Sequence, residues 1–183
     1  MTLSAVLLVG GLSRRMGRDK ATLLIGGIPL WSRQLSILRM LEPETLYISA
    51  RTAPLWAPPD VHVVLDAPPA RGPLSGIAAA LEAMQTTHLL ALAVDLPQMT
   101  AEHLRNLKLM AGPSAGVIPR NAEYFEPLAA IYPKGAASLA IDALRSGDTS
   151  LQSLIRELLE RRLVQTHDLS AAERPLYENL NSP

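Results

Sequence analysis

The residues of this chain best suited to chemistry stand in its first twenty positions, where two glycines and several basic side chains follow an apolar run. Residues 5–9 have the length and β-branched content of a buried strand, and Gly10 and Gly11 interrupt it. The polar and basic residues that follow are Ser13, Arg14, Arg15, Arg18 and Lys20. Glycines at a strand exit let backbone N–H groups approach an anion, and basic side chains neutralise its charge. The pattern predicts a loop that binds a nucleoside triphosphate.

The two best-known phosphate-binding loops do not fit this segment. A Walker A loop requires G-x-x-x-x-G-K-[ST], whereas the fifth residue after Gly11 is Met16, and Gly17 precedes Arg18. A dinucleotide-binding fingerprint requires G-x-G-x-x-G, and the glycine pair lacks that spacing. A dehydrogenase is therefore disfavoured. The competing interpretation of the segment is a strand followed by a solvated basic loop.

One aspartate follows a long apolar run later in the chain. Residues 88–94 are almost wholly apolar, as a strand buried on both faces should be, and the run ends on Asp95 with Pro97 close behind. Magnesium commonly takes one or two protein carboxylates and completes its coordination with water and substrate phosphates. Asp95 is therefore predicted to bind magnesium beside the triphosphate loop. Its competing role is to cap the following turn.

Asp66 and the loop after it are less specific signals. Asp66 follows the expected strand 61–65, and its residue type fits either contact with the nucleotide or a turn-capping role. Arg71 and Gly72 lie in a loop within reach of a second substrate, and the competing interpretation is a solvated surface arginine. The histidines show no metal-ligand spacing and are expected to be structural or at the surface; they are His62, His88, His103 and His167.

The elements that must position these residues alternate between strand and helix. Apolar runs predict strands at 5–9, 46–49, 61–65, 88–94, 115–118, 128–132 and 163–167. Helical patterns are expected at 30–41, 74–84, 101–110, 135–145 and 150–161. Pro29 is expected in the first helical turn, Thr100 as an N-cap, and Trp31 and Leu35 packed against the sheet.

This alternation predicts an α/β fold: a three-layer, Rossmann-like, mostly parallel twisted sheet with helices on both faces, forming a single domain over residues 1–183. Right-handed crossovers place the carboxyl ends of the parallel strands at one edge. The glycine loop, Asp66 and Asp95 each follow an expected strand, so they are predicted to share that edge.

The amino-acid composition excludes several classes of partner and of chemistry. The chain has 183 residues, 48% of them hydrophobic, with 17 basic and 17 acidic side chains, so it offers no overall field for nucleic acid or an anionic membrane. The absence of cysteine excludes disulfides, thiolate metal sites and a cysteine nucleophile. No apolar run approaches the roughly 18 residues of a membrane span, and no signal peptide is recognised, so a cytoplasmic location is expected.

The first loop and several later segments resemble a known family. The loop matches L-x-G-G-x-S-x-R-M-G-x-D-K, a nucleotidyltransferase signature, at Leu8, Gly10, Gly11, Ser13, Arg15, Met16, Gly17, Asp19 and Lys20. The later segments are GGIPL at 26–30, RGPLSG at 71–76, DLP at 95–97, EPLAAIY at 126–132 and YENLNSP at 177–183. Together they are similar to the molybdenum cofactor guanylyltransferases, over the whole chain.

The resemblance implies a nucleotide-diphospho-sugar transferase-like fold and a function. Such an enzyme uses GTP and Mg²⁺ to attach GMP to the terminal phosphate of molybdopterin, forming the guanine dinucleotide cofactor and pyrophosphate. It also implies transient contact with molybdopterin-delivering proteins or molybdoenzymes. The nucleotide-binding residues would be Leu8, Val9, Gly10, Gly11, Ser13, Lys20, Asp66 and Asp95, with Arg15, Lys20 and Asp95 catalytic and Asp95 on the metal. Arg71, Gly72, Asn179 and Asn181 would face the pterin substrate.

Two departures from the family pattern bear on this assignment. Val9 replaces the usual alanine, and Arg51 stands where relatives often have an asparagine near the nucleotide. The alternatives are a related transferase that uses CTP or a sugar phosphate, and a nucleotide-binding module without catalysis. The first would be shown by its nucleotide preference, and the second by binding of GTP without turnover.

Overall fold

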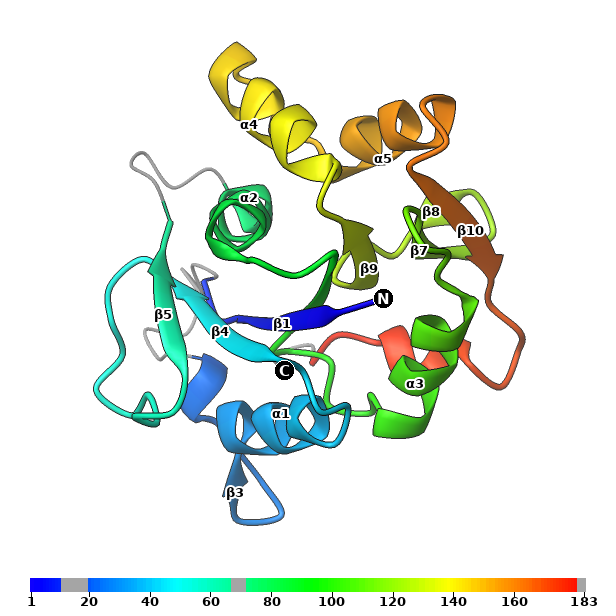
Figure 1. Cartoon of the computed structure of the whole chain (residues 1–183). Coiled ribbons are helices and arrows are strands. Elements are labelled where there is room, and N and C mark those ends of the chain that lie inside the picture. The colour runs from blue at the N-terminus through cyan, green and yellow to red at the C-terminus, as the bar shows by residue number, and fades with distance from the viewer. Residues whose placement is uncertain (11–19, 67–71, 181–183) are drawn as a thin grey trace.

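A computed structural model describes residues 1–10, 20–66 and 72–180, and one large sheet forms its centre (Figure 1). The strands lie in the order β10-β7-β9-β6-β1-β4-β5, and β8 pairs with β7. Their bounds are Val164–Asp168 for β10, Gly116–Asn121 for β7, Ala129–Pro133 for β9, His88–Ala93 for β6, Leu3–Leu8 for β1, Thr45–Ala50 for β4, His62–Leu65 for β5 and Tyr124–Phe125 for β8.

The sheet is mostly parallel, as the sequence predicts. β1 pairs in parallel with both β4 and β6, and β4 with β5 and β7 with β10 do the same. β9 is antiparallel to β6 and to β7, and the short β8 is antiparallel to β7. Because β9 runs backwards, its first residues lie at the edge where the parallel strands end.

Helices cover both faces of the sheet (Figure 1). α1 (Leu30–Arg39) and α3 (Ala101–Met110) pack on one face, and α2 (Pro73–Ala83), α4 (Ala136–Ser146) and α5 (Leu151–Glu160) on the other. Two 3-10 helices, η1 (Lys20–Thr22) and η2 (Arg174–Tyr177), complete the described helices. The predicted α/β class with helices on both faces is confirmed. None of the helices in the described ranges is long and apolar enough to cross a membrane.

Side-chain alternation in the central strands builds two cores. In β1, Leu3, Ala5 and Leu7 join the core under α1 and α3, whereas Val6 and Leu8 join the core under α2. Every residue of β1 is buried. This continuous burial is why the strand is apolar throughout rather than alternating with polar residues.

Local signals account for the helix ends. Thr100 is the N-cap of α3, as expected, and its side chain accepts a hydrogen bond from the His103 N–H. Ser150 caps α5 in the same way. Gly147 ends α4 with a φ of 86°, a left-handed conformation that glycine adopts without steric cost.

One expectation near α1 needs correction, and another gains a detail. Pro29 ends the small hairpin of β2 (Leu24–Ile25) and β3 (Ile28–Pro29), and it is the N-cap of α1 rather than a residue of its first turn. Leu35 is fully buried, but Trp31 is only half-buried and stacks on Trp56, with ring centroids 4.8 Å apart. Trp31 therefore packs at the edge of the core, as expected, and also holds the connection between β4 and β5.

Candidate active site

The chain leaves β1 between its two parallel neighbours. The Val9 N–H donates to the Ser49 carbonyl of β4 at 3.0 Å, and the Val94 N–H donates to the Leu8 carbonyl at 3.1 Å. From β1 the strand order runs outward in both directions, to β4 on one side and to β6 on the other. Such a reversal of strand order opens a crevice at the carboxyl edge, where ligands bind in open α/β sheets.

Lys20 and Asp95 meet at this edge. Lys20 lies in η1, Asp95 follows β6, and Lys20 Nζ donates to Asp95 Oδ2 at 3.1 Å. Their side chains are 28% and 22% exposed, so both remain accessible from solvent. The sequence predicted that the basic loop and this carboxylate would face each other. Residues 11–19 of that loop lie outside the described residues, and Lys20, which ends it, contacts Asp95. The pair offers a cation for phosphate and a carboxylate for a metal ion.

Asp66 lies close to the exit of β1, held by a residue that sequence reasoning did not single out. The Ser49 hydroxyl donates to Asp66 Oδ1 at 2.6 Å, and both residues are buried. A Cβ added to Gly10 would stand 2.9 Å from Asp66 Oδ2, so glycine makes room for the carboxylate. Gly76 of α2 likewise leaves space for the Ser49 hydroxyl. A serine inside an otherwise apolar strand was the available signal for Ser49.

A second buried polar residue supports the turn that carries Asp95. Gln34 of α1 is fully buried, and its Nε2 donates to the Leu96 carbonyl at 2.6 Å. Gln34 interrupts the apolar stripe of its helix at a position that faces the core. The contact fixes the backbone immediately after Asp95, and we regard Gln34 as a support for the site.

The C-terminal segment returns to the same place. The Leu180 N–H donates to the Asp95 carbonyl at 2.8 Å, and Gln98 Nε2 reaches the Glu178 carboxylate at 3.4 Å. Asn179, between these two anchors, is exposed. The structure therefore places the backbone of the expected pterin-binding segment beside Asp95.

The other predicted site residues differ in how the structure places them. Leu8 is buried, Val9 and Gly10 are half-buried at the strand exit, and Gly72 is exposed at the N-cap of α2 with a φ of 75°. Arg51 is exposed after β4. Gly11, Ser13, Arg15, Arg71 and Asn181 lie outside the described residues.

Two histidines belong to a network that ties the C-terminal segment to α3. Glu173 Oε1 lies 2.9 Å from His167 Nε2 and 3.4 Å from His103 Nδ1, and His103 Nε2 lies 2.7 Å from the Tyr177 hydroxyl. Burial lowers the pKa of His103. Burial also works to raise the pKa of Glu173, but hydrogen bonds from His167 and Ser170 outweigh it and lower that pKa to about 2. The expectation that the histidines are structural fits these contacts.

Glu126 is a further carboxyl group, which the sequence offered only as part of the EPLAAIY segment at 126–132. It precedes β9, and the Leu128 carbonyl accepts a hydrogen bond from Ala93 N–H at 2.7 Å, which places this end of β9 at the active edge. Glu126 is half-buried, and that burial raises its pKa. The antiparallel direction of β9, which sequence does not reveal, is what brings Glu126 there.

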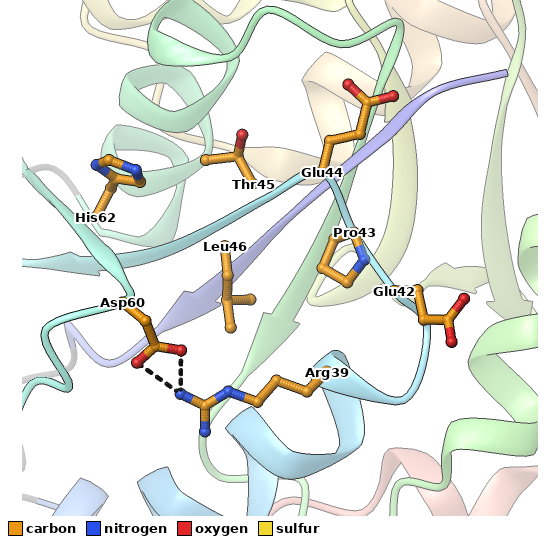
Figure 2. Close-up of a pocket in the computed structure, with 8 residues that line it drawn as sticks. All are labelled: Arg39, Glu42, Pro43, Glu44, Thr45, Leu46, Asp60 and His62. Atoms are coloured by element: carbon orange, nitrogen blue, oxygen red, sulfur yellow. Dashed lines mark hydrogen bonds and ion pairs between the residues drawn. The ribbon is translucent and has the colours of Figure 1, made fainter.

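A cavity of about 250 Å³ lies at the opposite edge of the sheet (Figure 2). It is lined by residues at the amino ends of β4 and β5 and at the end of α1, among them Glu44, His62 and Arg39. Figure 2 shows its Arg39 guanidinium pointing at Asp60, with contacts of 2.9 and 3.1 Å. Because ligands of open α/β sheets bind at the carboxyl edge, this cavity is not the candidate active site.

The carboxylate of Asp95 suits a hard cation whose remaining ligands are water and the phosphates of a substrate. Within the ranges that the structure describes, no group of three or more histidine and acidic side chains could hold a metal ion. One accessible carboxylate is nevertheless what magnesium requires when substrate phosphates and water complete its coordination. Asp95 therefore fits magnesium bound together with a nucleotide.

The fold is one that solved nucleotidyltransferases share. A nucleotidyl transferase from Methanothermobacter has the same fold, with a TM-score of 0.75 at 19% identity over 98% of this chain and 92% of the other. A molybdopterin-guanine dinucleotide biosynthesis protein A from Archaeoglobus fulgidus superposes with a TM-score of 0.73 at 26% identity, covering 98% and 93% of the two chains.

The family follows from sequence comparison. Residues 5–164 match the model of the MobA-like NTP transferase domain, and the chain belongs to that family. It is 37% identical to a probable molybdenum cofactor guanylyltransferase of Opitutus terrae, over 99% of this chain and 91% of the relative. It is 33% identical to a molybdenum cofactor guanylyltransferase of Pseudomonas fluorescens, over 98% and 90% of the two chains. The resemblance seen in the sequence motifs is confirmed.

Proposed function

We propose that this nucleotidyltransferase transfers GMP from GTP to the terminal phosphate of molybdopterin, with Mg²⁺, and releases pyrophosphate. The observation that carries the proposal is the contact of Lys20 with Asp95 at the carboxyl edge between β1 and β6. Relatives that match nearly the whole chain bear the name of this activity, which supports the choice of donor and acceptor.

The reaction joins an acceptor phosphate oxygen to the α-phosphorus of GTP and breaks the bond between that phosphorus and the bridging oxygen of pyrophosphate. The acceptor oxygen is already charged at neutral pH, so the protein needs no nucleophile of its own. Its task is to bring two anions together and to stabilise the charge that collects on the leaving group. Magnesium, when bound, supplies Lewis-acid stabilisation of the phosphates.

The residues of the chain divide this task between the two substrates. Lys20 binds the phosphates and offsets their charge, while Asp95 holds the metal ion and Asp66 contacts the nucleotide. The remaining donor-side assignments are Leu8, Val9, Gly10, Gly11, Ser13 and Arg15, with Arg15 on the transferring phosphate. On the acceptor side, Arg71, Gly72, Asn179 and Asn181 meet the pterin.

The decisive experiment offers the protein a choice of donor. Purified protein is incubated with molybdopterin, Mg²⁺ and each of GTP, CTP, ATP and UTP, and pyrophosphate release and product mass are followed. We expect a dinucleotide product with GTP. A product formed only with CTP would overturn the base assignment, and GTP binding without any turnover would identify a binding module instead.

Two matched variants locate the activity on the proposed edge. Asp95→Asn removes the carboxylate that we assign to the metal, whereas Asp60→Asn makes the same chemical change beside the cavity at the opposite edge. We expect loss of turnover in the first variant and wild-type turnover in the second. Equal activity of the two variants would remove Asp95 from the mechanism.

A further inference from the structure

The chain after β10 folds back across the molecule to the active edge (Figure 1). In Figure 1 this orange-to-red segment passes beside α3 and returns toward the middle of the sheet. Leu169 and Tyr177 are buried in the core under α1 and α3, and Leu180 packs against that core. The Leu180 N–H then donates to the Asp95 carbonyl at 2.8 Å. The segment is thus tied directly to the backbone of the proposed metal-binding residue.

Tyr177 is the anchor of this segment. Its hydroxyl lies 2.7 Å from His103 Nε2, and the two rings meet edge to face with centroids 5.4 Å apart. The side chain of His103 is 5% exposed, and Tyr177 is 6% exposed. A buried hydroxyl with a defined partner fixes the orientation of a ring that would otherwise be held by packing alone.

Glu173 completes the anchor from the far side of His103. Its Oε1 atom lies 3.4 Å from His103 Nδ1, so a proton on Nδ1 faces a carboxylate. In that tautomer Nε2 accepts the hydrogen bond from the Tyr177 hydroxyl, which also lies 3.4 Å from the Ala129 carbonyl. Glu173 is itself held by His167 and by the N–H and hydroxyl groups of Ser170.

We propose that Tyr177, His103 and Glu173 form a C-terminal clamp that positions residues 178–180 beside Asp95 for binding of the acceptor substrate. Tyr177 precedes Leu180 by three residues, so an anchored ring leaves the intervening backbone little freedom. Asn179, exposed within that stretch, is the side chain that the clamp presents. The three clamp residues are positioning residues, and the acceptor part of the inference rests on the proposed function.

The clamp itself is tested by amide hydrogen exchange at Leu180. Tyr177→Phe removes the hydroxyl and keeps the ring, so the protein should fold and the Leu180 amide should lose about fivefold to tenfold of its protection. Tyr132→Phe is the matched control, because Tyr132 is fully buried and its hydroxyl donates to the Pro127 carbonyl at 2.8 Å. That variant should lose comparable stability and leave the exchange at Leu180 unchanged. Unchanged protection in Tyr177→Phe, or equal loss in both variants, would overturn the clamp.

The role of the clamp in acceptor binding is tested by measuring the KM for molybdopterin and the KM for GTP separately. We expect Tyr177→Phe to raise the KM for molybdopterin about tenfold and to leave the KM for GTP unchanged, with Tyr132→Phe altering neither. A parallel rise of both constants, or a fall in kcat alone, would overturn the positioning role. If the wild-type protein forms no product from GTP and molybdopterin, the proposed function fails, while the exchange at Leu180 still decides whether the clamp exists.

Discussion

Replacing Gly10 with alanine tests the fit between the β1 exit and Asp66. The added Cβ would lie 2.9 Å from Asp66 Oδ2, well inside the roughly 3.5 Å at which nonbonded heavy atoms sit comfortably. The carboxylate cannot turn away freely, because its other oxygen accepts the Ser49 hydroxyl at 2.6 Å. Either the backbone shifts by several tenths of an ångström or this hydrogen bond is distorted.

The expected loss of stability follows from these two alternatives, a backbone shift or a distorted hydrogen bond. Overpacking of this kind costs about 1–3 kcal/mol, and loss of one buried hydrogen bond costs about 1 kcal/mol. We therefore expect Gly10→Ala to lower the free energy of unfolding by about 1–2 kcal/mol. Because Asp66 is displaced on the nucleotide side, the KM for GTP should rise about tenfold, which corresponds to about 1.4 kcal/mol.

The assay pairs chemical denaturation with steady-state kinetics, and Gly112→Ala serves as the control. A Cβ at Gly112 would meet its nearest neighbour, Ala115 Cβ, at 3.7 Å, an ordinary contact, so this variant should keep wild-type stability and kinetics. A double variant with Ser49→Ala frees the carboxylate to move, so its effect should be smaller than the sum of the single effects. Wild-type KM and stability in Gly10→Ala, or strict additivity in the double variant, would refute the reasoning.

Three further predictions concern the site and its supports. Asp95→Asn should fold normally and lower turnover by about a hundredfold or more, measured as pyrophosphate release at saturating substrates; near-normal turnover would contradict the assignment. Ser49→Ala should lower the free energy of unfolding by about 1 kcal/mol and raise the KM for GTP with little change in kcat, because Asp66 loses its partner; an unchanged KM would count against that link. Acid should destabilise the fold in two stages, since the pKa of His103 lies below 6.5 in the folded protein and that of Glu173 is about 2 instead of 4.5. The unfolded chain then binds these protons more readily, so stability falls below about pH 6.5 and again between about pH 4.5 and 2, whereas denaturation midpoints independent of pH over this range would contradict both shifts.

The sequence was sufficient for the parts of the site that strand ends determine. Parallel strands finish at one edge, so the residues that follow β1 and β6 had to come together, and Lys20 and Asp95 do meet there. The helices were predicted well because the sequence patterns that indicate them are local. The buried stripe that includes Leu35 and the N-cap at Thr100 are both present in the structure.

The parts that were not predicted depend on contacts between distant segments. An apolar run at residues 129–133 looks the same in a parallel and an antiparallel strand, so the direction of β9 and the position of Glu126 were not visible. The contact of Asp66 with Ser49 joins residues of two segments, so the sequence did not show it. In the sequence, Trp31 belongs to an apolar helical stripe. Its partner Trp56 lies in the connection between β4 and β5, which has no periodic pattern, so the stacking of the two rings was not predicted.

That tryptophan pair makes the intrinsic fluorescence of the protein a local signal. The sequence contains two tryptophans, and their indole planes are inclined by only 15°, close enough for their electronic transitions to couple. Tryptophan emission will therefore follow the packing of the connection between β4 and β5 on α1, and the helices on the opposite face, which contain no tryptophan, will not contribute to it. A fluorescence melt that precedes the far-ultraviolet melt would reveal detachment of this connection before the sheet itself unfolds.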